Sequence, residues 1–132
     1  MKYMLDTDTC IYMIRKKSQH VLEKIKETIN DGIAISSITL AELEHGVSKS
    51  GNPERNANAL TQILITIEVL PFDTIAASEY GLIRTDLERK GNVIGPMDML
   101  IAAHAKSRNL IMVTKNTREF DRVEGLIVEN WT

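Results

Sequence analysis

The chain has 132 residues, a formal net charge of −2 and one cysteine. A chain of this length usually forms one domain with its own hydrophobic core, and we expect 1–132 to be a single domain. The single cysteine excludes an intrachain disulfide, no apolar run is long enough to span a membrane, and the overall charge lacks the basic excess of many nucleic-acid-binding proteins.

Short apolar strands alternate with amphipathic helices along the sequence. In chain order we predict a strand over 2–6, helices over 9–16 and 19–31, a strand over 33–36, helices over 39–46 and 54–68, an extended edge segment over 69–72, helices over 74–90 and 97–108, and strands over 110–114 and 126–129. This alternation predicts an α/β fold with a mainly parallel sheet. Ligands of such sheets bind beyond the carboxyl ends of the strands.

One carboxylate stands directly where the first predicted strand ends. Asp6 lies in the segment Leu5-Asp6-Thr7-Asp8-Thr9. Either Asp6 or Asp8 could cap the helix that is predicted to begin near Thr9. One acid is enough for capping, so the other needs a different role, such as binding a divalent cation beside a phosphate.

Two further acids lie in segments that are otherwise apolar. Glu42 follows Thr39 at the spacing of a capping box, in which the glutamate bonds the threonine amide. Asp98 opens a helix that is apolar almost all round, and could cap it or interact with its dipole. A buried ionised carboxylate is costly unless it is paired or binds a metal, so a cation site is the alternative for both acids.

A fourth polar cluster follows the predicted strand 110–114. Asn116 and Glu119 have the spacing of a helix N-terminal cap, yet they also lie at the carboxyl end of a strand, where the fold would place a ligand. Thr7 and Thr114 could contact a water or a phosphate there, or simply end their strands. Oxygen ligands of this kind suit Mg²⁺ or Mn²⁺, and the three histidines lack the spacing of a zinc site.

Four motifs together resemble a known family. They are Leu5-Asp6-Thr7-Asp8, Ser37-Ile38-Thr39-Leu40-Ala41-Glu42-Leu43-x-x-Gly46, Ile94-Gly95-Pro96-Met97-Asp98-Met99-Leu100-Ile101-Ala102 and Val113-Thr114-x-Asn116-x-x-Glu119-Phe120. In this order they resemble the PIN domain and, more closely, the VapC toxins of bacterial toxin–antitoxin pairs. The resemblance covers nearly the whole chain and implies a PIN-like α/β/α sandwich, with a short, mainly parallel central sheet flanked by helices.

The resemblance also implies an activity and partners. It indicates a bacterial, cytoplasmic endoribonuclease that depends on Mg²⁺ or Mn²⁺ and is inhibited by a cognate VapB antitoxin. A homodimer and a toxin–antitoxin hetero-oligomer are expected, without a membrane. In such a site a metal-activated water attacks the RNA phosphodiester in line, and the metal neutralises charge on the leaving oxygen.

Site residues follow from the resemblance position by position. Asp6, Glu42 and Asp98 match the acidic triad that holds the metal. Asn116 stands where many PIN domains have an aspartate, and Glu119 is expected to supply the fourth catalytic acid instead. Asp8 is a second departure, since related toxins often have asparagine there. The expected supporting residues are Thr7, Asp8, Thr114 and Asn116.

Two alternative functions are weighed against the ribonuclease. A haloacid-dehalogenase-like phosphatase would use Asp6 as its covalent nucleophile and Asp8 as an acid and base. The chain is short for that class and lacks a late acidic pair beside a catalytic lysine. A catalytically inactive PIN module would only bind RNA or protein, and the presence of all three triad acids argues against it.

Substrate and partner surfaces are less sharply indicated. The predicted helices 54–68 and 74–90 carry broad apolar faces, which could contact a second copy or the antitoxin. With two phenylalanines and one tryptophan, no base-stacking platform is evident. Contacts with the RNA backbone are expected from a subset of Arg84, Arg89, Lys90, Arg108, Lys115 and Arg118.

Overall fold

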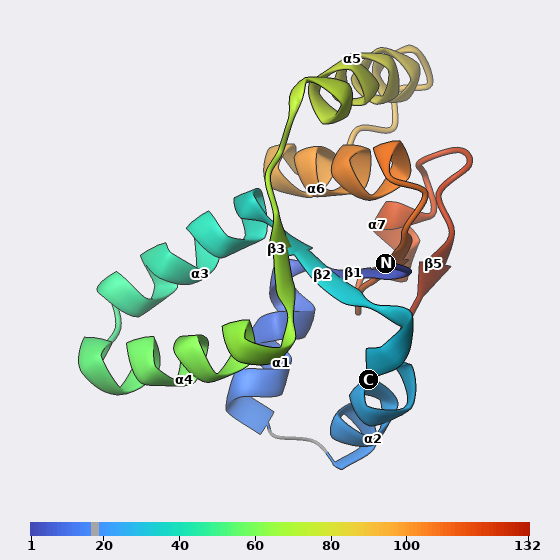
Figure 1. Cartoon of the computed structure of the whole chain (residues 1–132). Helices are drawn as coiled ribbons and strands as arrows, with labels where there is room; N and C mark the ends of the chain where they lie inside the picture. Colours follow the sequence, from blue (N-terminus) through green and yellow to red (C-terminus); the bar gives the residue numbers. More distant parts are fainter. Residues whose placement is uncertain (17–18) are drawn as a thin grey trace.

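The structure is a computed structural model that describes residues 1–16 and 19–132, in which five parallel strands form one sheet between two layers of helices (Figure 1). The strands are β1 (Tyr3–Leu5), β2 (Ile33–Ser36), β3 (Glu68–Leu70), β4 (Ile111–Val113) and β5 (Val128–Glu129). Their order across the sheet is β3-β2-β1-β4-β5. The predicted α/β/α sandwich is therefore confirmed, and β1 is its central strand.

The helices connect successive strands, as parallel pairing requires. They are α1 (Thr7–Lys16), α2 (Gln19–Thr28), α3 (Ser37–Ser48), α4 (Pro53–Thr66), α5 (Thr74–Arg89), α6 (Pro96–Ser107) and α7 (Thr117–Phe120). Among the residues described, no helix is long and apolar enough to cross a membrane.

Side chains of the strands alternate between the two faces of the sheet. Met4, Ala34 and Met112 face α5 and α6, where they share a buried cluster with Leu87 and Ile101. The opposite face packs against α1, α2, α3 and α4. This second cluster includes Tyr3, Leu5, Ile33, Ile35, Leu43, Leu60, Val113 and Trp131. Because both faces are covered, the carboxyl edge of the sheet is where polar groups can collect.

Two helices begin earlier than the sequence predicts. α1 begins at Thr7 because the Asp6 carboxylate accepts a hydrogen bond from the Thr9 amide at 2.8 Å, which makes Asp6 the capping residue. α3 begins at Ser37, and its cap is Ser36, whose hydroxyl accepts from the Ile38 amide at 3.1 Å. The predicted capping box of Thr39 and Glu42 is therefore wrong, and Glu42 lies inside the helix.

The C-terminal end of one helix also differs from the prediction. The predicted helix 19–31 ends as α2 at Thr28 and continues as a 3₁₀ turn over Ile29–Asp31. Gly32 then stops it with a positive φ of 92°, as its position predicts. The short helix α7 is not among the elements that the sequence predicts. Asn116 is its N-cap residue, as the spacing to Glu119 indicates, but its side chain makes no capping hydrogen bond.

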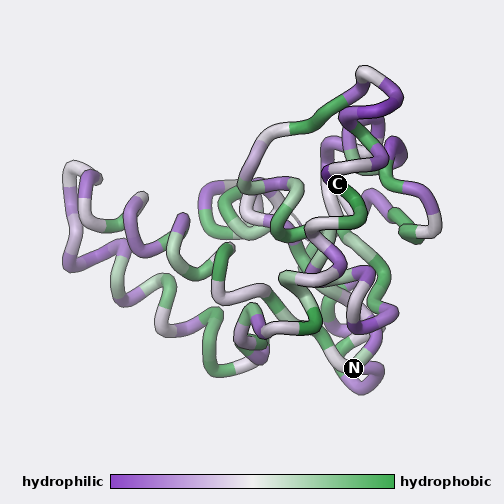
Figure 2. Tube along the Cα trace, turned by 90° about the horizontal axis from the view of Figure 1, so that it is seen from above, coloured by the Kyte–Doolittle hydropathy of each residue, from purple (hydrophilic) through white to green (hydrophobic). Residues whose placement is uncertain are grey.

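The pair α3 and α4 projects from the sheet as a helical hairpin (Figure 1). Hydrophilic and hydrophobic residues recur along each of these helices, as the tube on the left of Figure 2 shows. Each helix therefore has one apolar face for packing and one polar face. The root of this hairpin brings α3 alongside α1 and the carboxyl ends of the strands.

Candidate active site

Asp6 is held rigidly at the end of the central strand. Its side chain is 2% exposed, and one carboxylate oxygen accepts from the Thr9 amide at 2.8 Å. The other oxygen accepts from the Thr114 hydroxyl, which follows the neighbouring strand β4, at 2.6 Å. Burial raises the pKa of Asp6, and these hydrogen bonds oppose that shift. Thr114 therefore orients an acid rather than only ending a strand.

Asp98 lies in the first turn of α6, where the helix dipole favours a negative charge. Burial, followed by the charges of Glu119 and Asp6, nevertheless raises the pKa of Asp98 to about 7. Gly95 is the residue before the helix, and it makes no side-chain cap. Asp98 therefore stands among other acids, whose negative charges oppose its ionisation.

Glu119 reaches the same place from α7. One of its carboxylate oxygens accepts from the Gly95 amide at 2.8 Å, and the other accepts from the side-chain amide of Asn116. A side chain at Gly95 would stand 3.6 Å from Glu119 Oε1 and 3.7 Å from Asp98 Oδ2. Gly95 thus lies between the two acids, and Asn116 supports Glu119 by donating to its second oxygen.

Glu42 approaches from α3. Its Oε1 accepts from the Thr7 hydroxyl at 2.6 Å, and Thr7 Oγ1 lies 3.3 Å from the Thr39 hydroxyl. This bond joins residues 35 positions apart and replaces the local capping box. The exposed Asp8 makes no cap; its charge contributes to the raised pKa values of Asp6 and Asp98.

A hollow of about 570 Å³ opens at this edge of the sheet and is lined by Thr7, Asp8, Glu42 and Asp98. Asp6 does not line it because its carboxylate is buried. Within residues 1–16 and 19–132, no three acidic, histidine or cysteine side chains already stand close enough to enclose one metal ion. Asp6, Glu42 and Glu119 instead accept hydrogen bonds from the chain itself.

Sequence reasoning missed the basic residues of this hollow. Arg15 and Lys49 line it. Arg15 lies about two helical turns after Asp8 on α1, and Lys49 lies about two turns after Glu42, at the end of α3. That spacing was the available signal. Of the basic residues expected to contact substrate, Lys115 lies beside Asp8 in an adjoining hollow.

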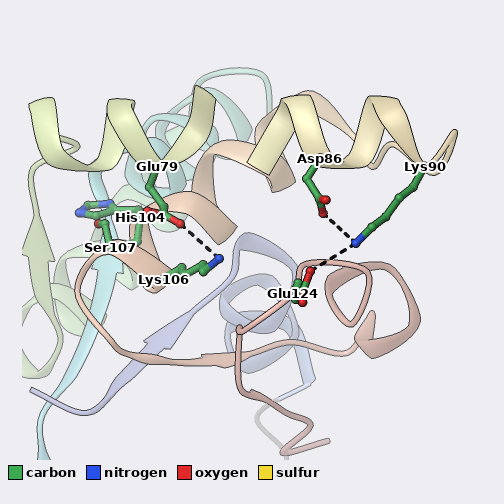
Figure 3. Close-up of polar contacts among 7 residues, drawn as sticks. All are labelled: Glu79, Asp86, Lys90, His104, Lys106, Ser107 and Glu124. Carbon is green, nitrogen blue, oxygen red and sulfur yellow. Dashed lines mark hydrogen bonds and ion pairs between the residues drawn. The ribbon is translucent and has the colours of Figure 1, made fainter. Parts of the chain in front are cut away.

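Other basic residues expected at the substrate are engaged elsewhere. Arg84 pairs with Glu88 on α5. Lys90, the residue that follows α5, pairs with Asp86 on that helix and with Glu124 (Figure 3). These residues do not line the acid hollow, so the structure gives no support for their expected substrate contacts.

The chain is similar to proteins of known family over almost its whole length. The PIN domain profile matches residues 3–126. The tRNA(fMet)-specific endonuclease VapC of Salmonella typhimurium is 47% identical over 131 residues, covering 99% of this chain and 98% of that protein. Ribonuclease VapC2 of Rickettsia felis is 46% identical over 132 residues, covering 99% of this chain and 98% of that protein.

Solved structures agree with the sequence matches. VapBC2 from Rickettsia felis, bound to a DNA fragment from its promoter, superposes with a TM-score of 0.97 at 44% identity, over 100% of both chains. DNA-bound VapBC from Salmonella typhimurium also gives 0.97, at 46% identity, over 100% of this chain and 99% of that one. These relationships exclude the haloacid-dehalogenase-like phosphatase and favour an enzyme over an inactive module. The chain belongs to the PIN domain family, and within it to the VapC ribonucleases.

Proposed function

We propose that this ribonuclease cuts RNA at the acid-lined hollow, with Asp6, Glu42, Asp98 and Glu119 as its catalytic carboxylates. The observation that carries the proposal is the meeting of acids from separate elements: Glu119 on α7 binds the Gly95 amide, and a Cβ atom at Gly95 would stand 3.6 Å from Glu119 and 3.7 Å from Asp98. Burial, together with the charges of Glu119 and Asp6, raises the pKa of Asp98 to about 7. A chain keeps such an arrangement at a cost in stability, and functional sites are where that cost is usually found.

The donor set suits a hard divalent cation, for which we propose Mg²⁺ or Mn²⁺. Carboxylate oxygens, with the hydroxyls of Thr7 and Thr114 close by, are the ligands and neighbours that such ions prefer. Asp6, Asp98 and Glu42 would hold the ion. When bound, it activates the attacking water and neutralises charge on the phosphate.

The chain's own residues prepare this site by orienting the acids. Thr114 and the Thr9 amide fix both oxygens of Asp6. The Gly95 amide fixes Glu119, and Asn116 donates to its second oxygen. Contacts that orient a metal ligand typically govern metal affinity and activity by about 10- to 100-fold, and we expect an effect of that size for each one here.

We propose tRNA(fMet) as the substrate, because a VapC endonuclease named for that specificity is 47% identical along 99% of this chain. We also propose that a VapB antitoxin inhibits the toxin in the bacterial cytoplasm. The VapBC complexes of similar chains support this. Exposed apolar side chains on α4 and α5, such as Ile65 and Leu82, are available for a homodimer or for toxin–antitoxin contacts.

The test is cleavage of tRNA(fMet) and of an elongator tRNA by the purified chain in Mg²⁺, Mn²⁺ or EDTA. We expect one cut, in tRNA(fMet) only, that EDTA abolishes and that Asp6→Asn and Asp98→Asn remove. Cleavage that survives both substitutions would overturn the assignment of the site. Equal cleavage of both tRNAs would overturn the substrate and leave the site intact.

A further inference from the structure

A second hollow adjoins the acid hollow at α1. This second hollow has a volume of about 240 Å³ and is lined by Asp8, Ile11, Tyr12, Arg15 and Lys115. Three of these residues, Asp8, Ile11 and Arg15, also line the acid hollow. The two hollows therefore adjoin one another at these three α1 side chains.

Two cations line this second hollow. Arg15 lies about two helical turns beyond Asp8 on α1. Lys115 directly follows Thr114, the residue that orients Asp6. Both side chains are exposed, and neither has a carboxylate within ion-pair distance among the residues that the structure describes. Their charges are thus available to an external anion.

Lys115 is also held in a defined place. Its ammonium nitrogen lies 4.7 Å from the centre of the Tyr12 ring, within the range of a cation–π contact. Tyr12 itself is half-buried and packs on the core of that face, so the ring is a fixed support. A lysine without such support would sample many rotamers before it met a ligand.

We infer that Arg15 and Lys115 form a phosphate-binding pair for the RNA backbone next to the scissile phosphate, with Tyr12 as the residue that positions Lys115. The inference rests on the acid site proposed above. The acids around Asp6 and Asp98 repel a phosphodiester chain, so a neighbouring cationic pair supplies attraction for the adjacent nucleotide. RNA is favoured over an antitoxin segment because Arg15 lines the acid hollow itself and Lys115 directly follows Thr114, which orients Asp6.

The experiment measures the affinity of fluorescein-labelled tRNA(fMet) as a function of KCl concentration, in an Asp98→Asn background that does not cut. Each lost backbone contact should reduce the slope of log K against log salt by about 0.7. We expect this reduction for Arg15→Gln and for Lys115→Gln, with an affinity loss of up to about fivefold each at moderate salt.

Matched controls separate this role from folding. Lys115→Arg and Tyr12→Phe should keep the slope, whereas Tyr12→Leu should lower affinity in a variant that still unfolds cooperatively, even though the loss of ring packing lowers its thermal stability. Lys90→Gln removes a lysine that is already ion-paired with Asp86 on α5 and should leave the slope unchanged (Figure 3).

Two results would overturn the inference. One is an unchanged salt slope in the double variant Arg15→Gln/Lys115→Gln. The other is unchanged RNA binding combined with lost binding of a VapB antitoxin, which would assign the pair to the partner protein. Failure of the acid site itself would show separately, as absence of cleavage by the wild-type chain.

Discussion

The acid hollow and the outer surface of α5 and α6 use charge in opposite ways. On the outer surface, Lys106 pairs with Glu79 at 3.3 Å and Lys90 pairs with Asp86 at 2.9 Å (Figure 3). At the hollow, acids stand beside acids, and burial with neighbouring charge raises the pKa of Asp98 to about 7. Charges that the chain neutralises itself maintain the fold, and charges that it leaves uncompensated point to an external ligand.

The largest effect should come from Asp98→Asn. We expect cleavage to fall by more than about 100-fold, since the loss of a metal ligand should exceed the loss of a contact that only orients one.

The same substitution should raise the stability of the metal-free protein. Because the pKa of Asp98 is raised in the folded state, the free energy of unfolding falls as pH rises from 3.8 towards 7. The Asp98→Asn substitution removes that decline. Urea unfolding at pH 5 and pH 8 in EDTA measures it.

Thr114→Val should have the next largest effect, because it removes the hydroxyl that orients Asp6. We expect activity to fall by about 10- to 100-fold, with a shift to higher Mg²⁺ requirement. Thr85→Val is the matched control, since that exposed hydroxyl donates to the Gly81 carbonyl within α5, away from the acids. Equal losses in the two variants would contradict the proposed role of Thr114.

Lys106→Gln tests the ion pairs on the outer surface of α5 and α6. Lys106 and Glu79 are partly exposed, with 33% and 24% of their side chains accessible. Such a pair contributes at most about 1 kcal/mol, so thermal unfolding should shift slightly and tRNA cleavage should stay unchanged. A cleavage defect comparable to that of Thr114→Val would show that the outer surface also serves the reaction.

The smallest effect concerns His104, which is fully buried on α6 and lies 2.8 Å from the Ser36 hydroxyl. Burial lowers the pKa of His104 in the folded state from its usual 6.5, with Asp73 opposing and Arg108 adding to the shift. The unfolded chain therefore binds more protons, and stability should fall as pH drops below 6.5.

His104→Leu should flatten that decline between about pH 6.5 and pH 5, whatever its effect on stability at neutral pH. Urea unfolding across this range measures the slope. His20→Gln is the control, because His20 is exposed on α2. A slope that His104→Leu leaves unaltered would mean that other groups dominate the acid response.

Local patterns in the sequence predicted the parallel sheet and the placement of Asp6 at its carboxyl edge. Short apolar runs that alternate with helices can be recognised from residues that are close together in the sequence. They also found Gly32 as a helix stop. The capping box at Thr39 and Glu42 failed because Ser36 starts the helix earlier and Thr7, 35 residues away, binds the glutamate. Local spacing carries no information about such a long-range bond.

The basic residues show the same limit. Arg84, Lys90 and Lys115 looked alike in the sequence, yet two of them pair within the chain and one lies beside the acid hollow. Their roles depend on which carboxylates the fold brings near them. The acids were easier to recognise, because a carboxylate in an apolar segment is unusual wherever the chain folds.

Whether the acids around Asp98 bind a divalent cation is measured by titrating Mn²⁺ into the wild-type chain and into Asp98→Asn at about pH 8 and following the loss of the free-ion paramagnetic resonance signal. We expect saturable binding to the wild type and binding weakened by more than about 100-fold in the variant. Binding of equal strength to both chains would contradict the claim that the uncompensated acids around Asp98 are a cation site.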